Sequence, residues 1–164
     1  MSEATLTRSA EKSEVSGGIQ MVSQFLGKDI KAMSDEVLAS CPGGKARCAF
    51  DLIYELATVN RMMASLITGE AKDVALPSGW TLAPADYRSK DKAQANLQGS
   101  IAELLAAYEN VPDAKLADPI TTPFGTMPAS KLLNMLNGHM MYHSGQLNYI
   151  QTIHGDDTFH WMEA

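Results

Sequence analysis

The chain has 164 residues, and this length is typical of one domain that buries enough apolar surface to fold without disulfides or a structural metal. Its 19 acidic and 13 basic side chains give a formal net charge of −6, which argues against a nucleic-acid partner or an anionic membrane surface, because both are bound through clustered lysine and arginine. Cys41 and Cys48 are expected to be free thiols, and we expect a cytoplasmic protein, because no stretch has the pattern of an export signal or a membrane span.

The first third of the chain is predicted to be helical from Ile19 onward. Residues 1–12 are polar and lack apolar periodicity, which favours a loose terminus or a helix that packs only weakly. Apolar residues then recur at steps of three and four from Ile19 to Met33, the spacing of a helix with one apolar face. Ser34 is a candidate cap for a short separate helix that includes Leu38.

The rest of the chain is predicted to supply three long helices and two long connections. Residues 45–67 predict a buried central helix, because they hold no Pro or Gly and are apolar nearly all round. Residues 71–88 predict a long loop that covers a site, with Trp80 as its anchor. Two further helices are expected over residues 89–109 and 128–154. The proline-rich connection between them allows a short strand pair at most.

Four long helices joined by one long crossover connection predict an all-α four-helix bundle. We expect a single domain over residues 1–164, with residues 155–164 as a C-terminal tail. The sequence contains no phosphate-binding glycine loop and no Gly-x-Ser-x-Gly elbow, so nucleotide binding and Ser/His/Asp catalysis have no local support.

Two histidines on the last predicted helix are the sharpest chemical signal. His139 and His143 are four residues apart, so on a helix they lie about 40° apart around the axis and about 6 Å apart along it. Both lie on the face that a bundle helix turns inward and can reach one metal ion, but a hydrogen-bonded pair of core histidines fits the spacing equally well. Met140 stands where zinc proteases of the His-Glu-x-x-His type have Glu, which argues against peptide hydrolysis by that route.

A two-histidine site needs at least a third ligand, and Glu55 on the facing helix is the best candidate. It lies within an apolar stripe, where a carboxylate costs several kcal/mol unless it is paired or bound to a cation. Two other interpretations stay open: Glu55 pairs with Arg61 or Lys45, or it reaches solvent at the helix edge. Asp51, one turn earlier, competes as the ligand or orients a ligating histidine.

The remaining candidates carry weaker predictions. His154 is expected to cap the end of the last helix, where the helix dipole favours a partly charged imidazole. His160, with Trp161, is a candidate to fold back over the mouth of the pocket. No residue is assigned as a general base. Three further residues are candidates to border the pocket: Tyr54, Tyr142 and Gln146.

The sequence around these histidines resembles the last helix of the DinB-like/YfiT-like metalloenzyme superfamily. The run His-Met-Met-Tyr-His-Ser-Gly-Gln at residues 139–146, preceded by Phe124-Gly125 and followed by Gly155-Asp156, carries the resemblance. It extends upstream through residues 50–57 and Gly79-Trp80, and thus covers most of the chain from about Ile19 onward.

The resemblance implies an up-down-down-up bundle in which three histidines, one on the second helix and two on the fourth, hold a divalent metal. His139 and His143 match the two ligands of the fourth helix, whereas Glu55 takes the place of the histidine on the second helix. A His/His/Glu set still binds zinc or nickel, the metals we expect first, as well as iron or manganese. Alternatively, the third ligand is lost and the site is vestigial.

The resemblance also implies an activity and partners. The superfamily includes thiol-dependent S-transferases and isomerases, so we expect metal-dependent transferase or hydrolase-type chemistry on a small molecule, with a low-molecular-weight thiol as candidate partner. A homodimer is also expected. The alternative is a non-catalytic, ligand-binding or stress-associated bundle that keeps the pocket and has lost the chemistry.

Overall fold

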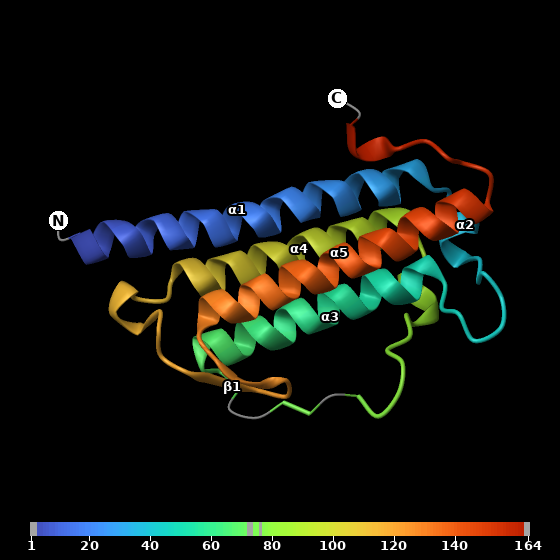
Figure 1. Ribbon diagram of the computed structural model, residues 1–164. Helices are drawn as coiled ribbons and strands as arrows, with labels where there is room; N and C mark the ends of the chain where they lie inside the picture. Colours follow the sequence, from blue (N-terminus) through green and yellow to red (C-terminus); the bar gives the residue numbers. More distant parts are fainter. Residues whose placement is uncertain (1–2, 72–73, 76, 163–164) are drawn as a thin grey trace.

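The computed structural model describes residues 3–71, 74–75 and 77–162. Four long helices lie along one another in it (Figure 1): α1 (Glu3–Ala32), α3 (Ala49–Thr68), α4 (Lys90–Glu109) and α5 (Ala129–Ile153). Helices α1 and α5 run in one direction, and α3 and α4 run in the other. The prediction of an up-down-down-up helical bundle is therefore confirmed.

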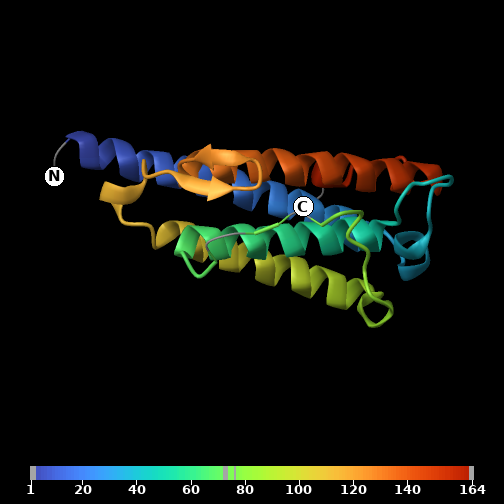
Figure 2. The same cartoon turned by 90° about the horizontal axis from the view of Figure 1, so that it is seen from below.

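The helices form two layers, as Figure 2 shows, with α1 beside α5 and α3 beside α4. Contacts of α1 with α4 and of α3 with α5 join the layers. Each helix buries its apolar stripe in one shared core, for example through Leu26, Ile53, Leu104 and Leu147. The helix that carries Glu55 thus packs against the helix that carries both candidate histidines.

Several helix ends follow the local sequence signals. Ser34 caps the short helix α2 (Asp35–Ala39), since its hydroxyl accepts a hydrogen bond from Val37 N, and Ser89 caps α4 in the same way. Gly69 takes the left-handed conformation that ends α3, with a φ of 78°. Gly155 does the same after α5, with a φ of 88°.

The structure decides an open prediction at the start of α1 and shows that the predicted start of α3 is wrong. Helix α1 begins at Glu3, and its polar part is held where Lys12 Nζ donates to the carbonyls of Glu109 (3.0 Å) and Val111 (2.6 Å) at the end of α4. Helix α3 begins at Ala49, because a turn through Gly44 and Lys45 and the non-helical residues 46–48 precede it. This later start places Arg47 before α3, in a segment without helical structure.

The crossover loop between α3 and α4 runs back along the bundle, as predicted, and includes the 3₁₀ turn η1 (Ala85–Tyr87). Trp80 does not anchor it by burial, because its side chain is 69% exposed. The loop is held instead by Asp51 Oδ1, which accepts from Ala83 N at 2.9 Å and from Arg88 Nη2 at 3.3 Å. A buried carboxylate needs such partners, so it fixes the loop more firmly than an aromatic ring at its surface.

The second connection contains the turn η2 (Asp113–Lys115) and a small hairpin of β1 (Ile120–Thr122) and β2 (Gly125–Met127), within the predicted limit of one strand pair. Thr122 pairs with Gly125, whose φ of 113° permits the tight turn. Phe124 lies at its tip. Among the described residues, no helix combines the length and hydropathy needed to span a membrane.

The C-terminal tail ends in the turn η3 (His160–Met162), which packs on α1 and does not close the pocket mouth. Trp161 stacks on Phe25 with ring centroids 4.4 Å apart, and its indole N–H donates to Asp29 Oδ1 at 2.9 Å. His160 contacts Asp156 Oδ2 at 2.9 Å. Aromatic stacking and a buried acceptor on α1 therefore draw the tail away from the predicted place. Both cysteines are free, as predicted.

Candidate metal centre

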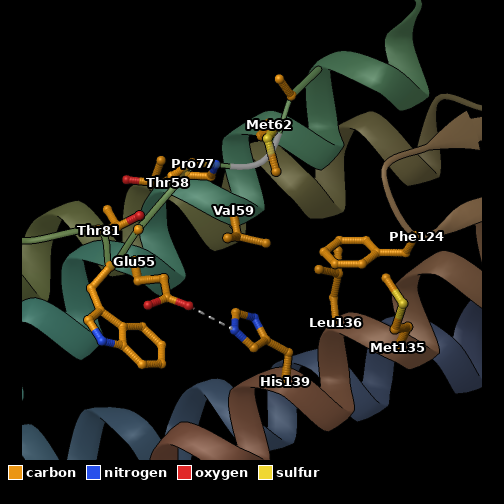
Figure 3. A pocket seen from close by; sticks show the side chains of 13 residues that line it. Glu55, Thr58, Val59, Met62, Pro77, Thr81, Phe124, Met135, Leu136 and His139 are labelled. Atoms are coloured by element: carbon orange, nitrogen blue, oxygen red, sulfur yellow. Dashed lines mark ion pairs between the residues drawn. The ribbon is translucent and has the colours of Figure 1, made fainter. Parts of the chain in front are cut away.

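Glu55 of α3 converges with His139 and His143 of α5 at the centre of the bundle. The two imidazole Nε2 atoms lie 3.0 Å apart, and Glu55 Oε1 lies 3.6 Å from each of them. Figure 3 shows the Glu55 carboxylate and the His139 ring pointing toward each other. We refer to these three residues as the histidine cluster.

The geometry of the histidine cluster fits a divalent metal ion. Separations of 3.0, 3.6 and 3.6 Å define a point about 2.0 Å from all three atoms, the usual distance of such ions from His nitrogen and carboxylate oxygen. The three ligand atoms lie within 4.8 Å of one another. Two imidazoles and one carboxylate suit zinc, nickel, iron or manganese.

The hydrogen bonding and burial of the histidines suit ligands in their neutral form. Gln146 Nε2 donates to Tyr142 Oη (3.1 Å), which turns its carbonyl oxygen toward His143 Nδ1 at 2.7 Å. The proton of His143 therefore lies on Nδ1, and the lone pair of Nε2 points into the cluster. Burial, then the charges of His139 and Arg47, lower the pKa of His143 to about 4, while burial and Arg47 also lower the pKa of His139.

The hydrogen bonding of His139 is less complete than that of His143. Its Nδ1 is buried and has no hydrogen-bond partner among the described residues, although its side chain keeps 25% of its exposure. Buried polar atoms without a partner are uncommon in folded proteins, so this nitrogen keeps a hydrogen-bonding capacity that the protein does not use. The two histidines therefore differ: Gln146 fixes the ring of His143, whereas His139 faces the pocket.

Arg47 is the ion-pair partner of Glu55, through Nη1 and Oε2. Its guanidinium also lies over the Trp80 ring, 4.4 Å from the centroid. The partners suggested by the sequence are therefore wrong, since Arg61 pairs with Glu103 at 3.0 Å. Each Glu55 oxygen thus has a separate role: Oε2 faces Arg47, and Oε1 faces the two imidazoles.

The structure places Asp51 outside the histidine cluster. It holds the crossover loop, as described above, and its Oδ2 accepts a hydrogen bond from the buried Cys48 thiol at 3.2 Å. Tyr54 packs edge-on against Tyr87, with ring centroids 4.9 Å apart. His154 follows the last helical residue of α5, and its side chain is exposed.

Comparison with known proteins places this helical arrangement in a family. Residues 20–147, which include all three members of the histidine cluster, match the sequence profile of the DinB superfamily. The chain belongs to the DinB superfamily. The resemblance noted in the sequence is thereby confirmed.

One solved structure similar to this DinB-superfamily chain is the crystal structure of a single-residue mutant of a mycothiol-dependent maleylpyruvate isomerase. The two agree with a TM-score of 0.65 at 16% sequence identity, over 83% of this chain and 60% of the other. This agreement shows a shared fold, and the present chain spans about 60% of the other chain's length. No curated protein sequence matches the chain.

A cavity of about 530 Å³, which we call the apolar cavity, opens beside the histidine cluster of this DinB-superfamily protein. Glu55 and His139 lie in its wall together with Thr58 and Thr81. Figure 3 shows Phe124, from the hairpin tip, closing one side opposite Val59. Most of the wall is apolar and comes from α3, α5, the crossover loop and the hairpin: Val59, Met62, Trp80, Phe124, Met135 and Leu136.

A second cavity, of about 360 Å³, lies on the other side of Trp80. Its wall includes Arg47, which pairs with Glu55, and Gln146, which bonds to His143. We call it the cationic cavity, because its lining contains two basic side chains. The residues that define its character are Lys45, Arg47, Trp80, Tyr142, Gln146 and Tyr149.

Proposed function

We propose that the protein is a divalent-metal-dependent enzyme, with Glu55, His139 and His143 as metal ligands and a small molecule as substrate. The observation that carries the proposal is the convergence of two neutral imidazoles and one carboxylate oxygen on a point at metal–ligand distance. Membership of the DinB superfamily supports the same conclusion. Zinc or nickel suits this ligand set best, with iron or manganese as alternatives.

The chain's own residues supply positioning. Gln146 holds the ring and the tautomer of His143, and Arg47 leaves one Glu55 oxygen for the metal. A bound divalent ion would lower the pKa of a coordinated water or thiol and so supply a nucleophile near neutral pH. The apolar cavity would hold the apolar part of a substrate beside His139 and exclude water from it.

The lining of the apolar cavity narrows the class of small molecule that we propose as substrate. The wall of the apolar cavity favours a compound with an apolar body, and transferase or hydrolase-type chemistry would act at its polar end. A low-molecular-weight thiol is our candidate second substrate, supported by the mycothiol dependence printed for the similar structure. A homodimer and a cytoplasmic location remain predictions, which gel filtration and cell fractionation test.

Elemental analysis of the untagged protein tests the metal site. We expect close to one equivalent of zinc or nickel in the wild type and almost none in His143→Ala. His154→Ala is the matched control, because it removes an exposed imidazole from the end of the same helix. A wild-type protein that holds no metal, and whose melting temperature does not move when zinc or nickel is added, would contradict the proposal.

One observation favours a second candidate, a non-catalytic ligand-binding bundle with a vestigial metal site. Arg47 already places a cation against Glu55, so the carboxylate is compensated without a metal ion. Replacing Glu55 by His separates the two functions. If Glu55 occupies a ligand position, Glu55→His should raise the affinity for zinc, whereas an unchanged affinity would remove the assignment of Glu55 as a ligand.

A further inference from the structure

The cationic cavity has a lining that differs in charge from the rest of the protein. The chain carries a net charge of −6, yet this cavity is lined by Lys45 and Arg47, and none of its lining residues in the described part of the chain is acidic. Lys45 is exposed and forms no ion pair with a described residue. An anion that enters this cavity would therefore meet two basic groups and no opposing carboxylate from its wall.

The remaining walls indicate an organic anion. Trp80, Tyr142 and Tyr149 supply aromatic surface, and the latter two are 62% and 66% exposed. Leu52 and Ile150 add aliphatic surface. Aromatic and aliphatic walls with a few polar groups are typical of sites for small organic molecules, whereas an inorganic anion would use only the basic groups.

The guanidinium of Arg47 connects this cavity to the histidine cluster. It contacts Glu55 and lies over the ring of Trp80, and both Arg47 and Trp80 line the cavity. A carboxylate in the cavity would compete with Glu55 for the guanidinium, because a paired carboxylate and guanidinium prefer two parallel hydrogen bonds. Arg47 bonds to Glu55 through Nη1, and an anion held by its remaining N–H groups would repel Glu55 and neutralise part of the guanidinium charge.

We propose that the cationic cavity binds a small organic carboxylate through Arg47 and Lys45, and that this binding weakens the Arg47–Glu55 ion pair and strengthens metal binding at the histidine cluster. The physical reason is charge: Arg47 withdraws negative charge from Glu55 and repels a nearby divalent ion. By linkage, the metal must strengthen carboxylate binding by the same factor. The coupling rests on the proposed function, whereas the carboxylate site itself does not.

The carboxylate site is tested first, on metal-free protein in EDTA, by titration with benzoate followed by calorimetry or NMR. We expect saturable binding that weakens about tenfold in both Lys45→Ala and Arg47→Gln, consistent with the loss of one charge-assisted contact. Lys115→Ala is the matched control, because Lys115 lines a different cavity. Circular dichroism checks that each variant is folded, and Arg47→Lys, which keeps the charge, should retain part of the affinity.

Two outcomes overturn the carboxylate site. Benzoate that does not bind, or that binds equally to the wild type and to both cavity variants, removes it. Sulfate that binds as tightly as benzoate shows a site for inorganic anions and contradicts the assignment of an organic ligand.

The coupling is tested by measuring zinc affinity with and without saturating benzoate. We expect zinc to bind several-fold tighter with benzoate in the wild type and to show no change in Arg47→Gln, which should already bind zinc more tightly. An enhancement that persists in Arg47→Gln means that benzoate ligates the zinc itself, and the coupling is wrong. A wild type that binds no zinc overturns the proposed function and the coupling together, while the titration in EDTA still decides the carboxylate site.

Discussion

Helix α5 carries two adjacent buried polar residues that belong to two different clusters. His143 faces α3 and joins the histidine cluster, whereas Ser144 faces α1 and donates a hydrogen bond to Asp29 Oδ2 at 2.6 Å. Trp161 completes this second group through Asp29 Oδ1. We call Asp29, Ser144 and Trp161 the Asp29 cluster.

The two clusters differ in how their polar atoms are satisfied. Both carboxylate oxygens of Asp29 accept hydrogen bonds from within the protein, and its side chain is fully buried. In the histidine cluster, by contrast, His139 Nδ1 lacks a partner among the described residues, and two ring nitrogens converge beside a cavity. A polar cluster that satisfies itself supports the structure, whereas one that leaves a polar atom without a partner beside a cavity is suited to a ligand.

The largest expected effect concerns the pH dependence of stability, because burial shifts the pKa values of His143 and Asp29 in opposite directions. It lowers the pKa of His143 to about 4 and raises that of Asp29. Below about pH 6.5 His143 is protonated in the unfolded chain but stays neutral in the folded one. The free energy of unfolding therefore falls by about 3 kcal/mol in metal-free protein as the pH falls from 6.5 to 4. Asp29 acts with the opposite sign, since the folded chain binds its proton more tightly.

Denaturant unfolding in EDTA between pH 7 and pH 4 measures this effect. The free energy of unfolding should fall more steeply in the wild type than in His143→Gln, and more steeply in Asp29→Asn than in the wild type. Parallel curves for His143→Gln and the wild type would show that the folded protein protonates His143 as readily as the unfolded chain does.

Removing the carboxylate of the Asp29 cluster should cost about 2 to 3 kcal/mol of unfolding free energy, because Asp29→Ala leaves the Ser144 hydroxyl and the Trp161 indole without their acceptor. Zinc affinity should not change, because the Asp29 cluster does not contact the ligands. Chemical denaturation and zinc titration of the same variant check both statements. A parallel loss of zinc affinity would show that the two clusters are one unit.

Removing the hydrogen bond that holds His143 should instead lower the zinc affinity and leave the stability nearly unchanged. Gln146→Ala frees the ring of His143 and is expected to weaken zinc binding about 10- to 100-fold, with little change in stability. Asn148→Ala is the matched control, because Asn148 lies on the same helix but donates to the Ser144 carbonyl and not to a histidine. Competition with a fluorescent zinc chelator measures both affinities, and equal losses would remove the role of Gln146.

The smallest effect is expected at the tail. Trp161→Phe keeps the stack on Phe25 and loses the indole hydrogen bond to Asp29, which should cost about 1 kcal/mol. Thermal unfolding measures the change. No loss would mean that the stack alone holds the tail.

The sequence alone predicted the features that depend on residues close together in the chain. Ser34, Ser89 and Gly69 mark helix ends through hydrogen bonds or dihedral angles set within a few residues. The spacing of His139 and His143 and the cost of burying Glu55 made the three residues candidates for one site, and the family resemblance then favoured Glu55 as the third ligand. These arguments need only helix geometry and the free energy of an unpaired charge.

What could not be predicted depends on contacts between distant segments. Arg47 pairs with Glu55 from the non-helical segment before α3, where the apolar pattern predicted helix. Phe124 enters the cavity wall through the position of the hairpin on the bundle. The crossover loop is anchored by Asp51 and not, as predicted, by Trp80. The buried carboxylate accepts hydrogen bonds from distant residues of the loop, and composition alone does not identify those donors.

The order of the helices also determines when the candidate site can exist during folding. Helices α3 and α4 follow each other along the chain and pack closely, although the long crossover loop separates them. Helix α5 comes last and pairs with both α1 and α3. A growing chain has neither histidine in place until that final docking step, so metal uptake would report the completion of folding and would lock the last helix onto the first three.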